Sequence, residues 1–315
     1  MNPIAGGIHL REWMKSCRLC PRACGADRTH ARGVCGANDR IEAARASLHM
    51  WEEPPISGTR GSGTVFFSHC SLGCVFCQNR QISRREAAGK ELSIQTLAQT
   101  FLSLERQGAH NINLVTGAHY VPQIIEALAI AKGQGLSIPI VYNSSGYESL
   151  DTLRLLDGWI DIYLPDYKYY SSYYAARYSH AADYREIAVG AISEMVRQTG
   201  VPQYDSDGLL TRGTVIRHLM LPGLAGDTAQ VLRDIAARFK DTALVSLMRQ
   251  YTPFDMQDWP ELDRTITDAE YAEACALFRD LGLGGFFQQS EAVSESFIPV
   301  FDGTGLEDTE KWKPY

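Results

Sequence analysis

The sequence predicts an α/β fold, a partial or closed (β/α)6 TIM-like barrel that follows an N-terminal Cys-rich module. Three observations support this prediction. Short apolar, β-rich runs alternate with amphipathic helical patterns from residue 64 onward, and such alternation is typical of parallel βα units. Seven of the eight cysteines fall into two groups near the N-terminus. The 315 residues suffice for one large domain with a smaller appended module.

The predicted elements follow one another in regular order. Strands are expected at the apolar runs 64–68, 111–116, 138–142, 159–164, 213–220, 243–249 and 284–287. Helices are expected at about 93–107, 121–132, 148–156, 183–199, 226–239 and 267–281. In the last helix, Thr267 and Glu270 predict a capping box. Cys275 lies on its apolar face, which favours packing in the core.

The chain is expected to divide into three segments. These are an N-terminal Cys-rich metal-binding module and linker at 1–60, the barrel at 61–290, and a C-terminal tail packed on the barrel at 291–315. The Pro54-Pro55 pair and a Gly-rich run predict an irregular stretch over 36–62, either a linker or a loop packed on the main domain. In such barrels function gathers at the carboxyl ends of the strands, so the candidate site residues are those that follow each strand.

Composition narrows the classes of function. With 45% hydrophobic and 21% charged residues, the chain is expected to fold as a globular protein. A net charge of −7 without a basic block argues against non-specific binding of nucleic acid. No apolar run is long enough to cross a membrane, and the first residues do not resemble a secretory signal. The cysteines therefore indicate metal or redox chemistry in the cytoplasm.

Cys70, Cys74 and Cys77 are the strongest chemical signal. They have the spacing C-x3-C-x2-C directly after the first predicted strand. Three thiolates on one loop can hold three corners of a cubane iron–sulfur cluster and leave the fourth iron open to a small chelating molecule. A zinc site would usually need four ligands, and inert core thiols are the other alternative. Neither explains the β-rich run before the loop or the aromatic Phe76 before the last cysteine.

This layout resembles the radical S-adenosylmethionine (SAM) superfamily. The resemblance implies a [4Fe-4S] cluster on these three cysteines, with the amino and carboxylate groups of SAM closing the fourth iron. It also implies that an electron from a donor such as flavodoxin or ferredoxin splits SAM into methionine and a 5′-deoxyadenosyl radical. The cofactor supplies that chemistry, and the protein positions it.

Polar side chains follow two of the later strands and lie within a third. Asn143 and Ser144 come after the third strand, and Asp166 and Lys168 after the fourth. Taken singly, these are an ordinary turn and a solvated ion pair. Arg217 lies inside the apolar fifth strand, where a guanidinium is costly unless it meets an anion such as a carboxylate.

Together and in order, these residues resemble the activating enzymes of glycyl-radical enzymes, particularly the pyruvate formate-lyase activase-like branch. The similarity runs from about Ile56 to Gly226, and the N-terminal segment suggests the same branch. It implies that Arg217, before the Pro222-Gly223 turn, contacts the carboxylate of SAM. It further implies that Asp166-x-Lys168 is the family's Asp-x-Lys, and that Asn143 and Ser144 reach the ribose.

One segment departs from that pattern. After the second strand the family commonly has Gly-Gly-Glu-Pro, which holds the amino group of SAM, whereas this chain has Thr116-Gly117-Ala118-His119. Thr116 or backbone carbonyls are the candidates to replace that contact. His119 then serves either as a substrate contact or in loop packing. Gln250 and Tyr251, at the end of the sixth strand, are further candidates for substrate contact.

The N-terminal cysteines form a second set. Cys17, Cys20, Cys24 and Cys35 have the spacing C-x2-C-x3-C-x10-C. They suit a closed tetrahedral zinc site or a second cubane cluster. Four free thiols are the remaining alternative. The compact Cys17/Cys20 pair and the Cys35-Gly36 turn favour zinc.

The sequence therefore predicts a radical SAM enzyme that abstracts a hydrogen atom. The favoured substrate is a backbone glycine of a glycyl-radical enzyme. A radical SAM enzyme that modifies a small metabolite or another protein is the alternative. A non-catalytic iron–sulfur or zinc binding module belongs to a different class, and the Asn143 turn and the Arg217 strand argue against it. No nucleic acid or membrane partner is expected.

Overall fold

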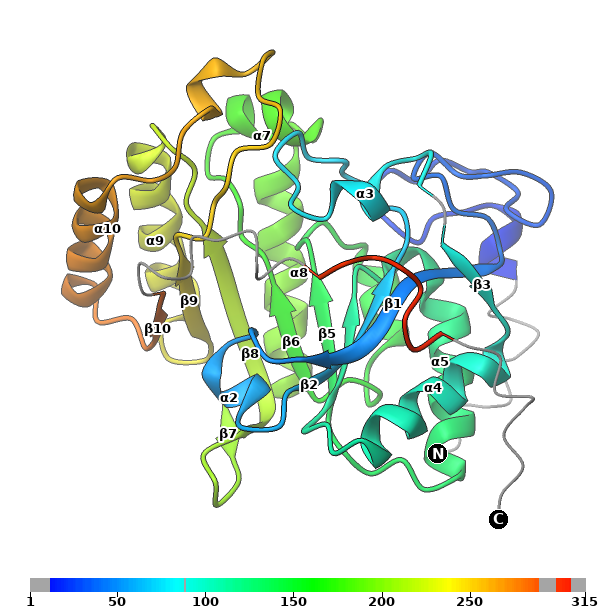
Figure 1. Cartoon of the computed structure of the whole chain (residues 1–315). Coiled ribbons are helices and arrows are strands. Elements are labelled where there is room, and N and C mark those ends of the chain that lie inside the picture. The colour runs from blue at the N-terminus through cyan, green and yellow to red at the C-terminus, as the bar shows by residue number, and fades with distance from the viewer. Residues whose placement is uncertain (1–11, 88, 289–298, 307–315) are drawn as a thin grey trace.

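One mostly parallel, open sheet organises the described part of the chain. The computed structural model describes residues 12–87, 89–288 and 299–306. The strands lie in the order β10-β9-β8-β6-β5-β4-β2-β1-β3, and β7 pairs with β8 beside this path. Helices cover the outer side of the sheet (Figure 1). None of the helices within those ranges is long and apolar enough to span a membrane.

The strands and helices have the following bounds. The strands are β1 (Ile41–His49), β2 (Ser62–Phe67), β3 (Lys90–Leu92), β4 (Ile112–Val115), β5 (Ile140–Ser144), β6 (Ile162–Pro165), β7 (Gln203–Tyr204), β8 (Leu210–Leu219), β9 (Leu244–Met248) and β10 (Gly285–Phe287). The helices are α2 (Pro54–Ser57), α3 (Arg80–Ser83), α4 (Ile94–Arg106), α5 (Val121–Gly133), α6 (Leu150–Leu155), α7 (Ser172–Ser179), α8 (Tyr184–Thr199), α9 (Ala225–Phe239) and α10 (Asp268–Asp280).

The predicted α/β fold is confirmed. β2, β4, β5, β6, β8 and β9 are neighbours in the sheet and pair in parallel. β10 adds a further parallel strand next to β9. The sheet is open, so the barrel is partial. The capping box of Thr267 and Glu270 at the start of α10 is confirmed, because each side chain bonds the backbone of the other residue.

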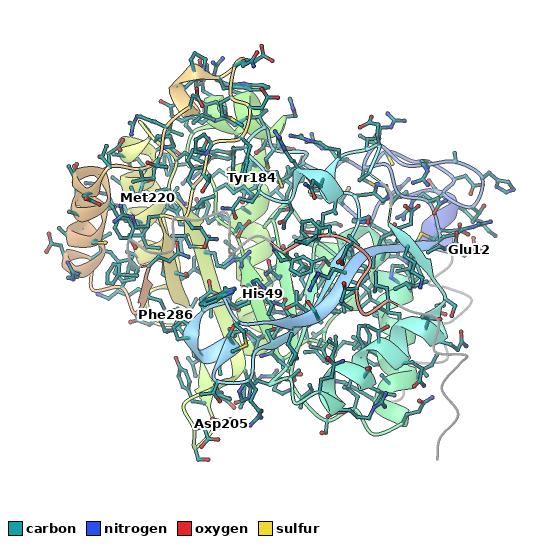
Figure 2. All side chains as sticks on the ribbon, in the orientation of Figure 1. Glu12, His49, Tyr184, Asp205, Met220 and Phe286 are labelled. Atoms are coloured by element: carbon teal, nitrogen blue, oxygen red, sulfur yellow. The ribbon has the colours of Figure 1, made fainter. Side chains whose placement is uncertain are left out.

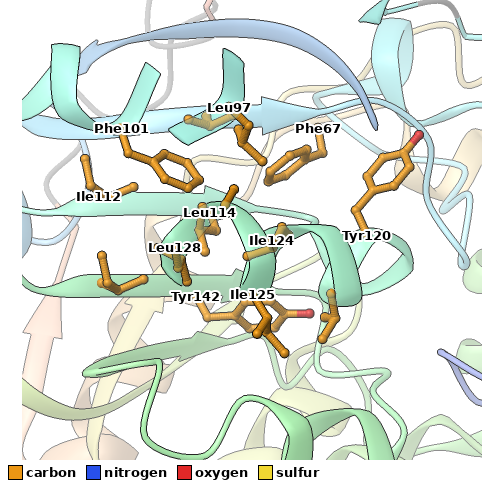
Figure 3. Packing of buried hydrophobic residues seen from close by; sticks show 14 of the residues in the cluster. Phe67, Leu97, Phe101, Ile112, Leu114, Tyr120, Ile124, Ile125, Leu128 and Tyr142 are labelled. Carbon is orange, nitrogen blue, oxygen red and sulfur yellow. The ribbon is translucent and has the colours of Figure 1, made fainter. Parts of the chain in front are cut away.

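Apolar side chains on the outer face of the sheet explain how the helices are held. Phe101 from α4 and Ile124 and Leu128 from α5 pack with Leu114 of β4 and Tyr142 of β5 (Figure 3). All five are fully buried. Burial of a side chain of this size stabilises the fold by about 1.5–3 kcal/mol, so this layer fixes the directions in which the strands end.

The region before β2 differs from the prediction. The stretch 36–62 is not irregular throughout, because β1 pairs antiparallel with β2 and with β3. The short helix α2 follows and lies close to β7 and β8 (Figure 1). Its Ile56 is fully buried among inward-facing apolar residues, including Val141, Ile162 and Val215. The β1–α2 segment therefore closes the inner side of the partial barrel near the amino ends of its strands.

The segment boundaries remain a prediction. β1, which falls in the predicted 1–60 module, belongs to the same sheet as the barrel strands. Of the predicted tail, residues 299–306 lie along β1, where the Ala46 N–H donates to the Thr304 carbonyl (2.9 Å). The rest of that tail, at 291–298 and 307–315, lies outside the described residues.

Candidate active site at the carboxyl ends of the strands

The cysteine loop begins where β2 ends and is anchored from both sides. The Ser68 N–H donates to the Glu42 carbonyl of β1 (2.9 Å), and the His69 N–H donates to the Ile82 carbonyl of α3 (2.6 Å). His69 is buried and has a positive φ of 74°, which is uncommon for a residue other than glycine. Its Nε2 lies 3.1 Å from Glu42 Oε2. This turn directs Cys70 and the residues after it over the carboxyl end of the sheet.

A cavity of about 220 Å³ lies at that end of the sheet. It brings together most of the residues singled out from the sequence, although they are spread over almost the whole barrel. The predicted residues that line it are Cys70, Cys74, Cys77, Thr116, Asn143, Ser144, Asp166, Lys168, Arg217 and Gln250.

The three thiols in this cavity suit a cubane cluster better than a single ion. Burial raises the pKa of Cys70 to about 12 and also raises that of Cys74, so their ionisation requires a compensating positive charge such as a metal. Among the described residues, no three His, Cys, Asp or Glu side chains are arranged to hold one metal ion. Cysteines at three corners of a cubane bind different irons, so they need not converge on one point.

A buried ion-pair network forms the next layer of the cavity. The Arg217 guanidinium donates to Asp166 Oδ1 from Nε (3.1 Å) and Nη2 (3.0 Å), and to Asn143 Oδ1 (2.7 Å). Lys168 Nζ donates to Asp166 Oδ2 (2.5 Å). Burial alone would raise the pKa of Asp166, but Lys168 and Arg217 outweigh it and hold that pKa below its usual value. Asp166 is therefore ionised and orients both cations.

Glu52 belongs to the same network and was missed in the sequence. It lines the cavity from the segment between β1 and α2. Its Oε1 accepts from Nδ2 of Asn113 (2.9 Å) and of Asn143 (3.3 Å), and its Oε2 accepts from Arg217 (3.3 Å). Burial raises the pKa of Glu52 and of the adjacent Glu53. The signal that could have found it is a pair of carboxylates directly before the Pro54-Pro55 turn.

Two neighbours of Glu52 also line the cavity. His49 is the last residue of β1, and Trp51 follows it. His49 is labelled in Figure 2, where β1 passes in front of the sheet. Burial lowers the pKa of His49 to about 4, so its imidazole is neutral near pH 7. One wall of the site therefore comes from a segment that the sequence had suggested was a linker.

Two backbone positions at the cavity depend on unusual geometry. Thr116 has a φ of 59°, which is strained for a β-branched residue and typical of functional sites. Its N–H donates to the Asn143 carbonyl (2.9 Å), which joins the ends of β4 and β5. A Cβ at Gly146 would lie 2.1 Å from the Asp166 carbonyl oxygen. Only glycine allows the turn after β5 to approach Asp166 so closely.

Two predicted substrate contacts lie outside this cavity. His119 is buried, its Nε2 lies 2.8 Å from the Ser68 carbonyl, and burial lowers its pKa to about 3. Tyr251 is fully buried and donates its hydroxyl proton to the Leu262 carbonyl (2.7 Å). Both side chains therefore serve packing in this structure. The expected core position of Cys275 is confirmed, since it is buried in an apolar cluster with Tyr271 and Phe278.

The N-terminal cysteines gather around Gly33 and Arg28. A Cβ at Gly33 would lie 3.5 Å from Cys35 Sγ and 3.6 Å from Cys24 Sγ, so both sulfurs lie beside this glycine. Fully buried Arg28 places Nη1 3.9 Å from Cys17 Sγ. Burial raises the pKa of Cys20 to about 12. These sulfurs lie near one another with a cation beside Cys17, but, as in the cavity, no three of the described thiols are arranged around one point that could hold a single metal ion.

Comparison with known proteins identifies the family. The family model of the radical SAM superfamily matches residues 64–234, more than half of the chain. This chain therefore belongs to the radical SAM superfamily. The match runs from β2 to α9 and includes the cysteine loop, Thr116, Asn143, Asp166 and Arg217. Membership implies a [4Fe-4S] cluster and SAM as cofactors.

Individual relatives are more distant. An uncharacterized protein of Methanocaldococcus jannaschii, MJ0674, is 26% identical over 270 residues, which cover 84% of this chain and 74% of that protein. A radical SAM methyltransferase from Sphaerobacter thermophilus has a TM-score of 0.50 at 12% identity, over 72% of this chain and 66% of that one. A domain of a pyruvate-formate lyase-activating enzyme from Bacteroides vulgatus reaches a TM-score of only 0.39 at 13% identity, over 54% of this chain and 92% of that domain. At 12% identity the methyltransferase structure shows a shared fold alone.

Proposed function

We propose that this protein reductively cleaves SAM and abstracts a hydrogen atom from its substrate with the resulting 5′-deoxyadenosyl radical. One observation carries the proposal: Cys70, Cys74 and Cys77 share a cavity with the polar side chains that end four successive parallel strands. When bound, the cluster supplies the electron for SAM cleavage. A non-catalytic binding module would not need these additional groups around the thiols.

The chain's own residues have distinct roles in this proposal. Lys168 and Arg217 are the cations that suit the carboxylate of SAM. Asp166 and Glu52 orient the Arg217 guanidinium through the hydrogen bonds described above. Asn143 and Ser144, at the end of β5, are assigned to the ribose. Thr116, whose side chain also lines the cavity, is the candidate for the contact that Gly-Gly-Glu supplies in related enzymes.

The favoured substrate is a backbone glycine of a glycyl-radical enzyme. The support is the resemblance of the Asp166-x-Lys168 segment and of Arg217 before Pro222-Gly223 to the activase branch. An electron donor of the flavodoxin or ferredoxin type would act before the chemistry. The test incubates the reduced protein and SAM with a candidate glycyl-radical enzyme and records electron paramagnetic resonance spectra. A glycyl radical that requires SAM supports the activase role, and its absence from every such partner contradicts it.

A small metabolite is the second candidate substrate. The observation that favours it is the closure of the partial barrel by β1 and α2, which places buried Glu52 in the wall of the cavity. A cavity lined by several polar side chains suits a small polar molecule. Deuterium transfer from a labelled metabolite into 5′-deoxyadenosine would establish this class of substrate. Failure of transfer from any small molecule, together with a glycyl radical on a protein, would exclude it.

We also propose that Cys17, Cys20, Cys24 and Cys35 bind a second metal centre, with zinc favoured over a second [4Fe-4S] cluster. The support is the proximity of Cys24 and Cys35 to Gly33 and the buried cation beside Cys17. Zinc would have to draw the four sulfurs together, because no three of the described thiols surround one point. A metal would also stabilise a short segment that has little core of its own. The compartment we propose is the cytoplasm, because its reducing conditions keep thiols free and suit a reaction that depends on an iron–sulfur cluster.

A further inference from the structure

Each of the three cysteine sulfurs in the cavity accepts at least one hydrogen bond from the protein. The donors come from the cysteine loop itself, from the end of α7 and from the end of α3. They are the Leu72 N–H to Cys70 Sγ (3.5 Å), the Ser179 hydroxyl to Cys74 Sγ (2.9 Å) and the Ser83 hydroxyl to Cys77 Sγ (3.4 Å). The Ser179 bond is the shortest, and both of its partners are buried.

The Ser179 hydroxyl is the middle of a longer chain. The Tyr169 hydroxyl oxygen lies 2.8 Å from Ser179 Oγ. A serine hydroxyl has only one proton to donate. Since that proton points to Cys74 Sγ, Tyr169 must be the donor to Ser179. Tyr169 and Ser179 have no exposed surface, and hydrogen bonds strengthen one another in such a low-dielectric setting.

The backbone around Ser179 is tied to the cysteine loop. The Val75 N–H donates to the Tyr178 carbonyl (2.9 Å). Arg22, which lies between two cysteines of the N-terminal set, donates to the Ser179 carbonyl (3.3 Å) and to the Ser71 carbonyl (3.1 Å). The guanidinium thus bridges the end of α7 and the loop that carries Cys70 and Cys74. These contacts hold the Ser179 hydroxyl toward the sulfur.

We propose that Ser179, oriented by Tyr169, is a positioning residue that raises the reduction potential of the cluster bound through Cys74. This inference rests on the proposed function. The step concerned is the transfer of one electron from a flavodoxin- or ferredoxin-type donor, which is oxidised, to the cluster, which is reduced. No bond forms or breaks. Reduction adds negative charge that the cysteine sulfurs share, and a donor hydrogen bond stabilises the more negative state. Ser83 acts on Cys77 in the same direction, and its longer distance predicts a smaller effect.

The test is a potentiometric titration of the anaerobically reconstituted full chain, without SAM, followed by electron paramagnetic resonance. Ser179→Ala should lower the midpoint potential of the cluster. At the midpoint potential of the wild type, the variant's ratio of reduced to oxidised cluster should be about tenfold lower, which corresponds to 59 mV for a one-electron couple. Tyr169→Phe, which removes the orienting donor, should shift the ratio less and in the same direction. Ser179→Thr retains a hydroxyl and should stay within about twofold of wild type.

Ser193→Ala is the matched control. Ser193 is exposed on α8, and its hydroxyl donates to the Val189 carbonyl of its own helix, so the ratio should not change. An unchanged ratio in Ser179→Ala with intact iron content overturns the inference. If Ser179→Ala does not fold, the same ratio is measured in Tyr169→Phe and Ser83→Ala. If the ratio is unchanged in both of these variants, the inference is overturned. A wild-type protein without any reducible cluster would instead overturn the proposed function, and this inference with it.

Discussion

The two cysteine-rich segments contain similar spacings but lie in different surroundings. Cys70, Cys74 and Cys77 line a cavity at the carboxyl ends of the parallel strands, with Lys168 and Arg217 in the same cavity. The N-terminal set converges on Gly33 and on Arg28, which is fully buried. The first set lines a cavity that a small molecule can enter, whereas the described second set lies outside that cavity, with Cys17, Cys20 and Cys35 buried. Spacing alone therefore shows that cysteines can bind metal, and the surroundings decide whether that metal can take part in chemistry.

The segments are nevertheless connected. Arg22 lies between Cys20 and Cys24 and donates to the carbonyl of Ser71 in the other cysteine loop (3.1 Å). Its guanidinium also lies 5.2 Å from the centre of the Tyr147 ring, a cation–π contact. A change in the N-terminal segment can thus reach the cavity through one side chain. The predictions below separate the roles of the two sets.

The largest difference is expected in iron content. Cys77→Ala should lose about four irons per chain, because two remaining thiolates do not hold a cubane. Cys275→Ala should retain them, since Cys275 packs into the apolar core from α10. Metal analysis of protein purified and kept without oxygen measures both variants. Full iron content in Cys77→Ala would show that the cluster is held elsewhere.

The N-terminal set should respond separately. Replacing Cys17, Cys20, Cys24 and Cys35 together by serine should remove about one zinc, or about four irons if the centre is a second cubane. The iron bound through Cys70, Cys74 and Cys77 should remain. Elemental analysis distinguishes the two metals. If zinc and iron contents both equal those of wild type, the N-terminal set binds no metal, and the compared segments then differ in chemistry as well as in surroundings.

Within the cavity, Arg217→Ala should weaken SAM binding more than tenfold. Loss of one partner of a desolvated ion pair typically costs about 2–5 kcal/mol. Arg212→Ala is the matched control on the same strand, because Arg212 donates to the carbonyls of Gln198 and Thr199 instead. Calorimetry with SAM measures both variants. Equal affinity in Arg217→Ala and wild type would remove Arg217 from the SAM site.

The last comparison concerns a buried carboxylate between β5 and α6. Glu148 accepts from the Tyr142 hydroxyl (3.3 Å), and burial raises its pKa from 4.5 to about 7. The folded state therefore keeps a proton that the unfolded state loses, so the free energy of unfolding falls as the pH rises from 4.5 through 7. The loss is roughly 3 kcal/mol at about 1.4 kcal/mol per pKa unit.

Glu148→Gln should remove most of this pH dependence, as measured by denaturant unfolding at pH 5 and pH 8. Glu126→Gln on the half-buried side of α5 is the control and should leave it in place. A wild-type protein equally stable at both pH values would contradict the assignment of a proton to Glu148.

The parallel strands could be predicted because their runs are apolar on both faces. Val65, Leu114 and Tyr142 face the outer helices, and α4 shows a clear apolar stripe. The residues that follow each strand could therefore be placed at one end of the sheet. Cys70, Asn143, Asp166 and Arg217 do line one cavity there.

The β1–α2 segment could not be predicted by the same reasoning. β1 has the sequence IEAARASLH, in which small alanines and the charged Glu42 and Arg45 give no alternating pattern. Its pairing with β2 and β3 depends on the tertiary structure, which often overrides propensity in strands. The place of Glu52 in the cavity depends on that pairing, and its one signal in the sequence is the Glu52-Glu53 pair before Pro54-Pro55. Ser179 was missed because α7 lies within a tyrosine-rich stretch. From the sequence alone, tyrosines that pack in the core could not be distinguished there from residues that line a binding site.

Formation of 5′-deoxyadenosine from SAM tests the central claim most directly. Anaerobically reconstituted, reduced wild-type protein should produce 5′-deoxyadenosine and methionine in equal amounts. Cys74→Ala should produce neither, because it lacks a thiolate that the cluster requires. Production that depends on the reductant and on Cys74 would support the account. Its absence from wild type with a full complement of iron, or normal production by Cys74→Ala, would contradict it.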